Sequence, residues 1–158
     1  MNIEEISELI KQKEQELNNL KEQYDKKIKQ EKAKVLKSKS GNMEKSIYLL
    51  GFEFESSAGR TEQYLEFHRV FRTEFKKLLK PYTKKILIDE PNHFDISGFF
   101  ELNDGRVFYF SIEDLRWDKE YMLIRTAKDF KDYTGGSNNF IKLDKNFTDN
   151  LFKFLNIK

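Results

Sequence analysis

The sequence predicts an α+β protein in which a long N-terminal helix precedes a small antiparallel sheet packed with helices. Residues 1–40 contain no proline and form charged heptads, whereas all fifteen phenylalanines lie in residues 41–158. In that second segment the spacing of apolar residues changes between the helical and the strand period. We therefore expect a coiled-coil helix over 1–40 and one α+β globular domain over 41–158.

The first segment carries an apolar stripe with alternating steps of three and four residues. Its members are Ile3, Ile6, Ile10, Leu17, Leu20 and Tyr24, with one gap at Lys13. This spacing is typical of the a/d seam of a coiled coil, and the later shift to Ile28 and Val35 resembles a stutter. A lone amphipathic helix is marginal in water, so the stripe needs another copy, the globule or a target. Pairing with another copy, as a homodimer through residues 3–35, or packing on the globule is favoured over a foreign partner.

The segment that follows the helix is expected to contain a hinge, a strand and a second helix. Residues 37–42 lack apolar periodicity and predict the hinge. Residues 47–54 suggest a strand with a bulge at Gly51, although 47–50 also fit a continued helix. Residues 56–59 indicate a loop. Thr61 is a suitable N-cap for a helix whose aromatic residues recur until Pro81.

The rest of the chain alternates as strands do. Residues 84–89 form a β-branched run, and residues 94–102 and 107–112 flank an Asn-Asp-Gly turn, which predicts a hairpin. The remaining predictions are a strand at 121–126, a loop at 129–139, a short strand at 140–143 and a closing helix at 147–155.

Composition excludes several classes of protein. The absence of cysteine excludes disulfides and thiolate sites, and fits a reducing compartment. No apolar run is long enough to cross a bilayer, and residues 1–10 are acidic where a signal peptide is basic, so we expect a cytoplasmic protein without membrane contact. Charge is segregated: residues 1–20 and 86–120 are acidic, whereas residues 21–39 and 60–85 are basic.

Catalytic residues are sparse. His93 and Asp95 have strand spacing, and Asp95, Glu101 and Glu113 lie near the predicted hairpin, which leaves a metal-dependent hydrolase or nuclease as one alternative. The lysine expected after a Glu-x step is missing, since Leu115 stands there. His68, on an aromatic helix face, is more typical of a boundary residue than of a ligand. We expect a non-enzymatic protein with neither metal nor cofactor.

Two loops form the candidate contact surface for a protein partner. Trp117 and Arg116 belong to the residue types enriched at interface hot spots. The predicted partner-binding residues are Arg116, Trp117, Asp118, Asp132, Tyr133 and Asn138. The Gly135-Gly136 pair is interpreted as a turn in preference to a phosphate cradle, because no nucleotide-binding motif surrounds it. Most aromatic residues lie at core spacing, so core packing is favoured over stacking on nucleic-acid bases.

A second alternative is a nucleic-acid-binding accessory protein. It would use the lysines of residues 21–39 and a basic helix. The candidate residues on that helix are Arg69, Arg72, Lys76, Lys77 and Lys80. Interleaved glutamates weaken both patches, and lysine-rich faces of this kind are usually only solvated.

Several strings between residues 93 and 143 resemble small uncharacterised proteins of phages and mobile elements of low-GC Gram-positive bacteria. They are residues 94–99, 104–106, 114–117, 123–128 and 132–138. The resemblance leaves the N-terminal helix uncovered and carries over no binding residues. It implies a setting in which small proteins block host defence systems, including Cas nucleases. An anti-CRISPR role is therefore an expectation from that setting, and no spacing in this chain shows it.

Overall fold

The computed structural model describes residues 1–37, 43, 47 and 62–157. Contacts within the chain divide it into two compact units, Met1–Ser38 and Lys39–Lys158. Each unit is described by itself below. In the described part of the chain, no helix combines the length and the apolar character that crossing a membrane requires.

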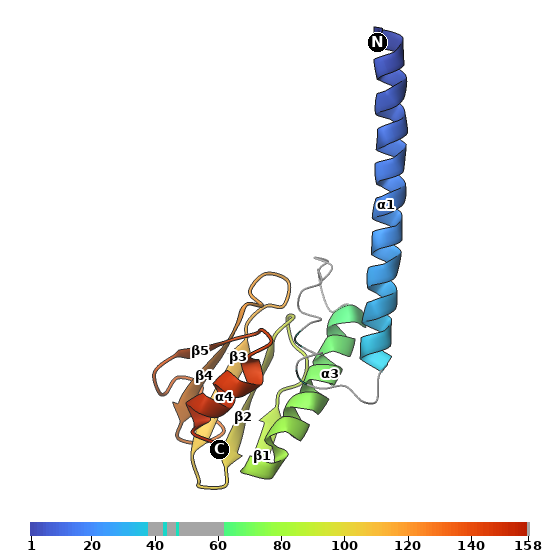
Figure 1. The fold of residues 1–158 in the computed structure, drawn as a ribbon. Helices are drawn as coiled ribbons and strands as arrows, with labels where there is room; N and C mark the ends of the chain where they lie inside the picture. The colour runs from blue at the N-terminus through green and yellow to red at the C-terminus, as the bar shows by residue number, and fades with distance from the viewer. Residues whose placement is uncertain (38–42, 44–46, 48–61, 158) are drawn as a thin grey trace. The chain divides into compact units, whose positions relative to one another are not determined.

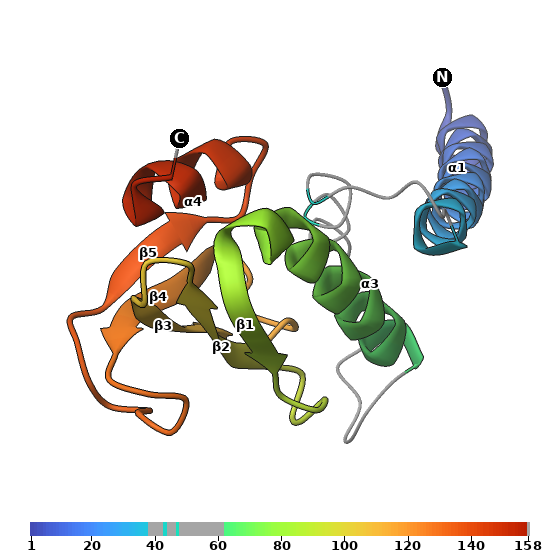
Figure 2. The ribbon, with the colours of Figure 1, turned by 90° about the horizontal axis from the view of Figure 1, so that it is seen from below.

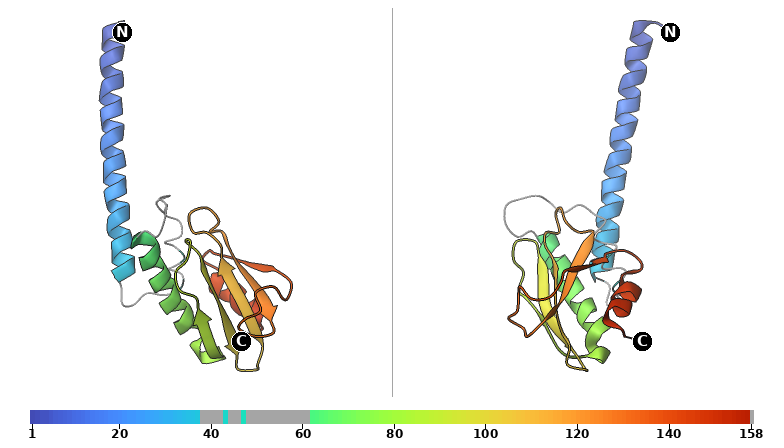
Figure 3. Two further views of the ribbon diagram at one scale, coloured as in Figure 1. Left: turned by 180° about the vertical axis from the view of Figure 1, so that it is seen from behind. Right: turned by 90° about the vertical axis from the view of Figure 1, so that its left-hand side faces the viewer.

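The first unit is one uninterrupted helix, α1 (Ile3–Lys37), which is seen along its length in Figures 1 and 3. Its start is set by a capping box. The Asn2 side-chain oxygen accepts from the Glu5 backbone N–H at 2.8 Å, and the Glu5 carboxylate accepts from the Asn2 backbone N–H at 2.9 Å. The predicted N-terminal helix is confirmed. Of the predicted hinge, Lys37 ends α1, and residues 38–42 lie outside the described residues.

The second unit contains the aromatic helix that the sequence predicts. It is α3 (Glu62–Leu79), which passes into the short 3-10 helix η2 (Lys80–Tyr82) at Pro81. Thr61, the loop at 56–59 and most of the strand predicted at 47–54 lie outside the described residues. Ile47 itself is helical and buried, so a strand is wrong at this position and the helical alternative is correct there.

The sheet is an antiparallel meander in the order β1-β2-β3-β4-β5. Its strands are β1 (Thr83–Ile88), β2 (Ile96–Leu102), β3 (Val107–Ile112), β4 (Tyr121–Ala127) and β5 (Asn139–Lys142). The predicted hairpin is confirmed: β2 pairs with β3 around Gly105, whose φ of 94° only glycine adopts readily. β2 starts at Ile96 and not at Phe94, because His93 and Phe94 have positive φ angles of 48° and 64° and turn the chain.

The helices α3 and α4 (Phe147–Leu155) cover the same face of the sheet, as Figure 2 shows. The Phe75 ring of α3 lies 4.8 Å from the Phe110 ring of β3. The Phe154 ring of α4 lies 6.0 Å from the Phe108 ring. α4 ends at Asn156, a left-handed residue whose N–H bonds back to Lys153. The core therefore lies between this face and the two helices, and the closing helix is confirmed.

Candidate functional site

The β3–β4 connection (residues 113–120) is closed by hydrogen bonds within it and by one to the turn before β2. The Asp114 carboxylate accepts three bonds from Arg116: from the backbone N–H at 2.9 Å, from Nε at 3.0 Å and from Nη2 at 2.8 Å. The side-chain bonds from Arg116 lower the pKa of Asp114. Leu115 is fully buried and donates its backbone N–H to the Phe94 carbonyl at 2.8 Å. The backbone N–H of Trp117 and that of Asp118 both bond the Asp114 carbonyl oxygen.

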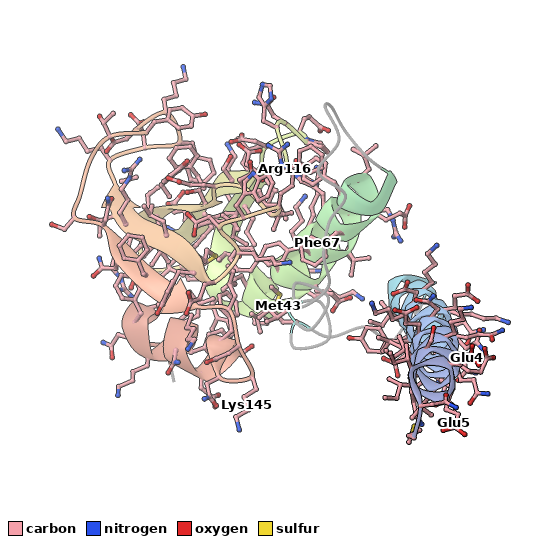
Figure 4. All side chains as sticks on the ribbon, turned by 90° about the horizontal axis from the view of Figure 1, so that it is seen from above. Glu4, Glu5, Met43, Phe67, Arg116 and Lys145 are labelled. Atoms are coloured by element: carbon pink, nitrogen blue, oxygen red, sulfur yellow. The ribbon has the colours of Figure 1, made fainter. Side chains whose placement is uncertain are left out.

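This hydrogen bonding fixes Arg116 beside aromatic rings and leaves a tryptophan outside. The Arg116 guanidinium lies 4.4 Å from the centre of the Phe94 ring and 5.6 Å from that of Trp117. Figure 4 labels Arg116 among the side chains of this part of the sheet unit. Trp117 is 70% exposed, the largest exposed fraction of any large hydrophobic residue described in the sheet unit. The loop presents Trp117 to solvent on a preorganised backbone.

A second pair of exposed aromatic residues lies on β4 and β5. Tyr121 and Phe140 are 42% and 60% exposed, and their rings meet edge to face at 6.3 Å. The strand register places them on the face opposite the helices, together with Tyr109 and Leu123. Phe140 is exposed but was not among the contact residues predicted from the sequence. Successive side chains of a strand point to opposite faces, so burial of Ile141 places Phe140 on the other face of the sheet.

The β4–β5 connection (residues 128–138), which contains the predicted contact residues Asp132, Tyr133 and Asn138, is built around Asp132. The Asp132 carboxylate accepts from the backbone N–H groups of Lys128 at 2.9 Å, Thr134 at 3.3 Å and Gly135 at 2.8 Å. These hydrogen bonds, led by that from Lys128, lower the pKa of Asp132. The Asp132 carboxylate therefore shapes its own loop.

Two aromatic residues of this loop cover the open face of the sheet. The Phe130 ring stacks on Phe99 at 5.6 Å, and the Tyr133 ring meets Phe99 edge to face at 5.1 Å. Phe99 is fully buried as a result, although its strand position faces away from the helices. Tyr133 stays 52% exposed, and desolvation, followed by the charge of Asp89, raises its pKa. The loop forms a small second core.

Asn138 ends the loop beside an arginine. Its side-chain oxygen accepts from Arg125 Nη1 at 3.4 Å, and the Arg125 guanidinium lies 4.6 Å from the centre of the Tyr109 ring. The predicted contact residues lie in two loops, one before β4 and one after it. The loop before β4 holds Arg116, Trp117 and Asp118, and the loop after it holds Asp132, Tyr133 and Asn138. A strand of this length spans on the order of 20 Å.

The basic residues of α3 are largely paired with carboxylates. Arg69 contacts Glu66 at 3.1 Å, Arg72 contacts Glu90 at 3.6 Å, and Lys77 contacts Glu74 at 3.5 Å. The other two candidates are Lys76, which is half-buried, and Lys80, which is exposed. The paired residues reduce the net positive charge that this face of α3 offers to a phosphate backbone.

Of the three carboxylates of the hydrolase alternative, Asp95 and Glu113 flank the Ile96–Ile112 pair of β2 and β3, and only Glu101 lies apart from them. Asp95 precedes β2, whereas Glu101 lies near the other end of that strand and contacts Lys84 at 3.8 Å. Burial, followed by the charge of Asp89, raises the pKa of Asp95. Among the described residues, no group of three or more histidine, cysteine, aspartate or glutamate side chains has the geometry to hold a metal ion.

His68 is buried at the core boundary of α3. Its ring packs edge to face on Tyr64 at 5.9 Å, and desolvation, followed by the charge of Arg72, lowers its pKa. Tyr64 joins α3 to the turn before β2: its hydroxyl donates to the Asp95 carbonyl at 2.6 Å and accepts from the Asn92 N–H at 3.0 Å. The side chains of His68 and Tyr64 are both buried and contribute to the packing of α3.

The apolar stripe of α1 is a separate exposed surface. Figure 4, which looks nearly along this helix, shows side chains projecting on all sides, with Glu4 and Glu5 labelled. The apolar members are 44–86% exposed, and they are Ile3, Ile6, Ile10, Leu17, Leu20 and Tyr24.

Comparison of the chain with protein-family models, with curated protein sequences and with solved structures finds no match.

Proposed function

We propose that this protein acts by binding another protein, as an inhibitor of a host defence nuclease such as a Cas effector, and has no catalytic activity of its own. The observation that carries the proposal is the hydrogen-bonded β3–β4 connection, which presents Trp117 at 70% exposure beside a fixed Arg116. Tryptophan and arginine are among the residues enriched at interface hot spots. The resemblance to phage and mobile-element proteins supports the choice of target.

The charges around Trp117 favour a basic target surface. Glu113, Asp118 and Glu120 are all exposed in the same connection, and of these Glu120 lies 3.9 Å from Lys142. A nuclease holds its nucleic acid in a basic channel, and an acidic protein surface matches that channel in sign. In this proposal the aromatic residues anchor the complex, while the carboxylates raise the association rate and compete with phosphate.

In this proposal the N-terminal helix sets how many chains assemble. Its stripe is expected to form a homodimer through residues 3–35, which presents more than one sheet unit to the target. Nucleic-acid binding through α3 is less favoured, because Arg69, Arg72 and Lys77 are already paired with carboxylates.

The test is a cleavage assay with purified candidate Cas effectors, with binding measured in parallel. Trp117→Ala should weaken binding about 30-fold or more, which corresponds to about 2 kcal/mol for a hot-spot tryptophan. Leu65→Ala, an exposed apolar residue on α3, is the matched control and should leave affinity unchanged. Absence of binding and of inhibition at micromolar concentration for every candidate would refute the proposal.

A charge-reversal pair separates steering from anchoring. Asp118→Lys combined with Glu120→Lys should slow association more than it speeds dissociation, with the difference shrinking as salt rises. Titration of labelled DNA and RNA at low salt tests the rival function. Strong salt-dependent binding that is lost in Lys76→Glu/Lys80→Glu would favour the nucleic-acid alternative over inhibition by protein contact.

A further inference from the structure

The seam of α1 is apolar for three heptads and polar afterwards. The capping box at Asn2 and Glu5 starts the helix so that Ile3 takes an a position. Counting from there, six of the seven seam positions up to Tyr24 are apolar, and Lys13 is the exception. The same count places Lys27, Glu31 and Lys34 at the next seam positions. The apolar surface available for pairing is therefore concentrated in residues 3–24.

We propose that α1 pairs with α1 of a second copy of this chain, in parallel and in register, over residues 3–24. In that arrangement each exposed apolar seam residue meets its own counterpart, which gives six apolar layers and one layer in which Lys13 faces Lys13. In the antiparallel register that sets Ile3 against Lys34, Ile6 would face Glu31 and Ile10 would face Lys27. The antiparallel register that pairs Ile6 with Tyr24 and Ile10 with Leu20 gives four apolar layers, because Ile3 then faces Lys27 and Leu17 faces Lys13. Three heptads of matched layers reach the length that a coiled coil requires.

Charge at the flanks of the seam fits the same register. In a parallel pair, a residue at g faces the residue five positions later at e of the other helix. Glu16 occupies g and Lys21 occupies e, so each copy offers one attractive contact to the other. The other flanking combinations, Leu9 with Glu14 and Gln23 with Ile28, place no like charges together.

Parallel pairing has an electrostatic consequence that antiparallel pairing would reverse. Residues 1–20 carry five acidic and two basic side chains, and residues 21–39 carry eight basic and three acidic ones. A parallel pair therefore sets acidic half beside acidic half and basic half beside basic half. Raising salt from 0.1 M to 1 M reduces the Debye length from about 10 Å to about 3 Å and screens this repulsion. Association should tighten with salt, whereas an antiparallel pair would weaken.

The orientation also determines where the sheet units are attached. Both chains leave a parallel pair at the same end, so the two sheet units are tethered together at that end. The assembly is then bivalent toward any target of the sheet unit. Helix pairing and nuclease inhibition are separable, because pairing is measured with the purified chain alone.

Single-cysteine crosslinking tests orientation directly, since the chain has no cysteine of its own. Full-length Ile6→Cys should form a covalent dimer on mild oxidation, and Ile3→Cys is a second variant in case the first impairs the helix. Gln12→Cys, which lies outside the seam, is the control and should stay uncrosslinked. A mixture of Ile6→Cys with Glu31→Cys should yield no disulfide between the two variants.

Light scattering of the full chain completes the test. The expected mass is at least twice the 19.0 kDa of one chain, and Leu17→Lys should reduce it to that of a monomer. Asn18→Lys adds the same charge outside the seam and should leave the assembly intact. A monomeric mass for the unmodified chain, or a disulfide between Ile6→Cys and Glu31→Cys, would overturn the proposal. Failure to bind a nuclease would leave parallel pairing standing and would refute only the inhibitor function.

Discussion

The helix α1 and the sheet unit use the same apolar residue types in opposite ways. Ile10 and Leu17 are 53% and 51% exposed, whereas Ile112 and Leu151 are fully buried. Helical propensity, a capping box and Glu and Lys neighbours set the backbone of α1, but they provide no surface against which its stripe is buried. In the sheet unit, strands and helices that are far apart in sequence pack together and bury each other's apolar residues. Regular secondary structure therefore does not by itself bury apolar residues.

Burial of the exposed stripe in a helix pair contributes a free energy of the same order as the cost of association. Full burial of an isoleucine or leucine contributes about 1.5–3 kcal/mol, so six half-exposed residues contribute on the order of 6 kcal/mol per helix. Two helices together contribute about twice that. This sum falls within the cost of about 4–15 kcal/mol for losing translational and rotational freedom. Each additional apolar layer therefore changes the equilibrium strongly.

The largest expected contrast between the two regions is that between Phe75→Ala and Leu17→Ala. Phe75 is fully buried and contacts the Phe71, Phe100 and Phe110 rings, so its removal should lower the free energy of unfolding of the sheet unit by about 3–5 kcal/mol. Leu17→Ala should change that quantity by less than about 0.5 kcal/mol. Denaturant unfolding followed by aromatic circular dichroism measures both. Equal losses would show that the comparison is wrong.

The next effect concerns Tyr64, which links α3 to the turn before β2. Tyr64→Phe removes the hydroxyl that donates to the Asp95 carbonyl and accepts from the Asn92 N–H. Leaving part-buried backbone groups unpaired should lower the free energy of unfolding of the sheet unit by about 1–3 kcal/mol. Tyr24→Phe on exposed α1 is the matched control and should change this value little. A neutral Tyr64→Phe would indicate that water replaces the hydroxyl.

The buried His68 should make the free energy of unfolding of the sheet unit depend on pH. Desolvation, followed by the charge of Arg72, lowers the pKa of His68 below 6.5, so the unfolded chain takes up a proton before the folded one does. Stability should be complete above about pH 6.5 and should fall as the pH decreases below it, by at most about 1.4 kcal/mol per unit. His68→Gln should reduce this slope, measured as unfolding free energy between pH 7 and pH 5.

The smallest effect belongs to the start of α1. Asn2→Ala removes the oxygen that accepts from the Glu5 backbone N–H, which should cost about 1 kcal/mol of helix stability. The measurement is the loss of helical circular dichroism on heating, because α1 contributes a long helix to that signal. The unfolding of the sheet unit should not change. A shift in that transition would mean that the two regions unfold together.

Sequence reasoning predicted most elements because their signals are local. Phe67, Phe71 and Phe75 recur at helical spacing, and the Asn-Asp-Gly turn marks the hairpin that forms around Gly105. It did not predict how the loops are held. The Asp132 carboxylate accepts three backbone N–H groups of its own loop, and a carboxylate in a polar loop has the same sequence signature with or without these bonds.

The sequence by itself determined the periodic elements, the break between the helix and the aromatic segment, and the stripe of α1, since these depend on neighbours within a few residues. Tertiary structure alone decided that Phe130 covers Phe99 and that Arg116 lies over Phe94. These pairs are separated by more than twenty residues along the chain, and their contacts depend on the strand register and on loop paths. The exposed position of Trp117 follows from that long-range packing, because its neighbours Leu115 and Arg116 are anchored to the turn before β2.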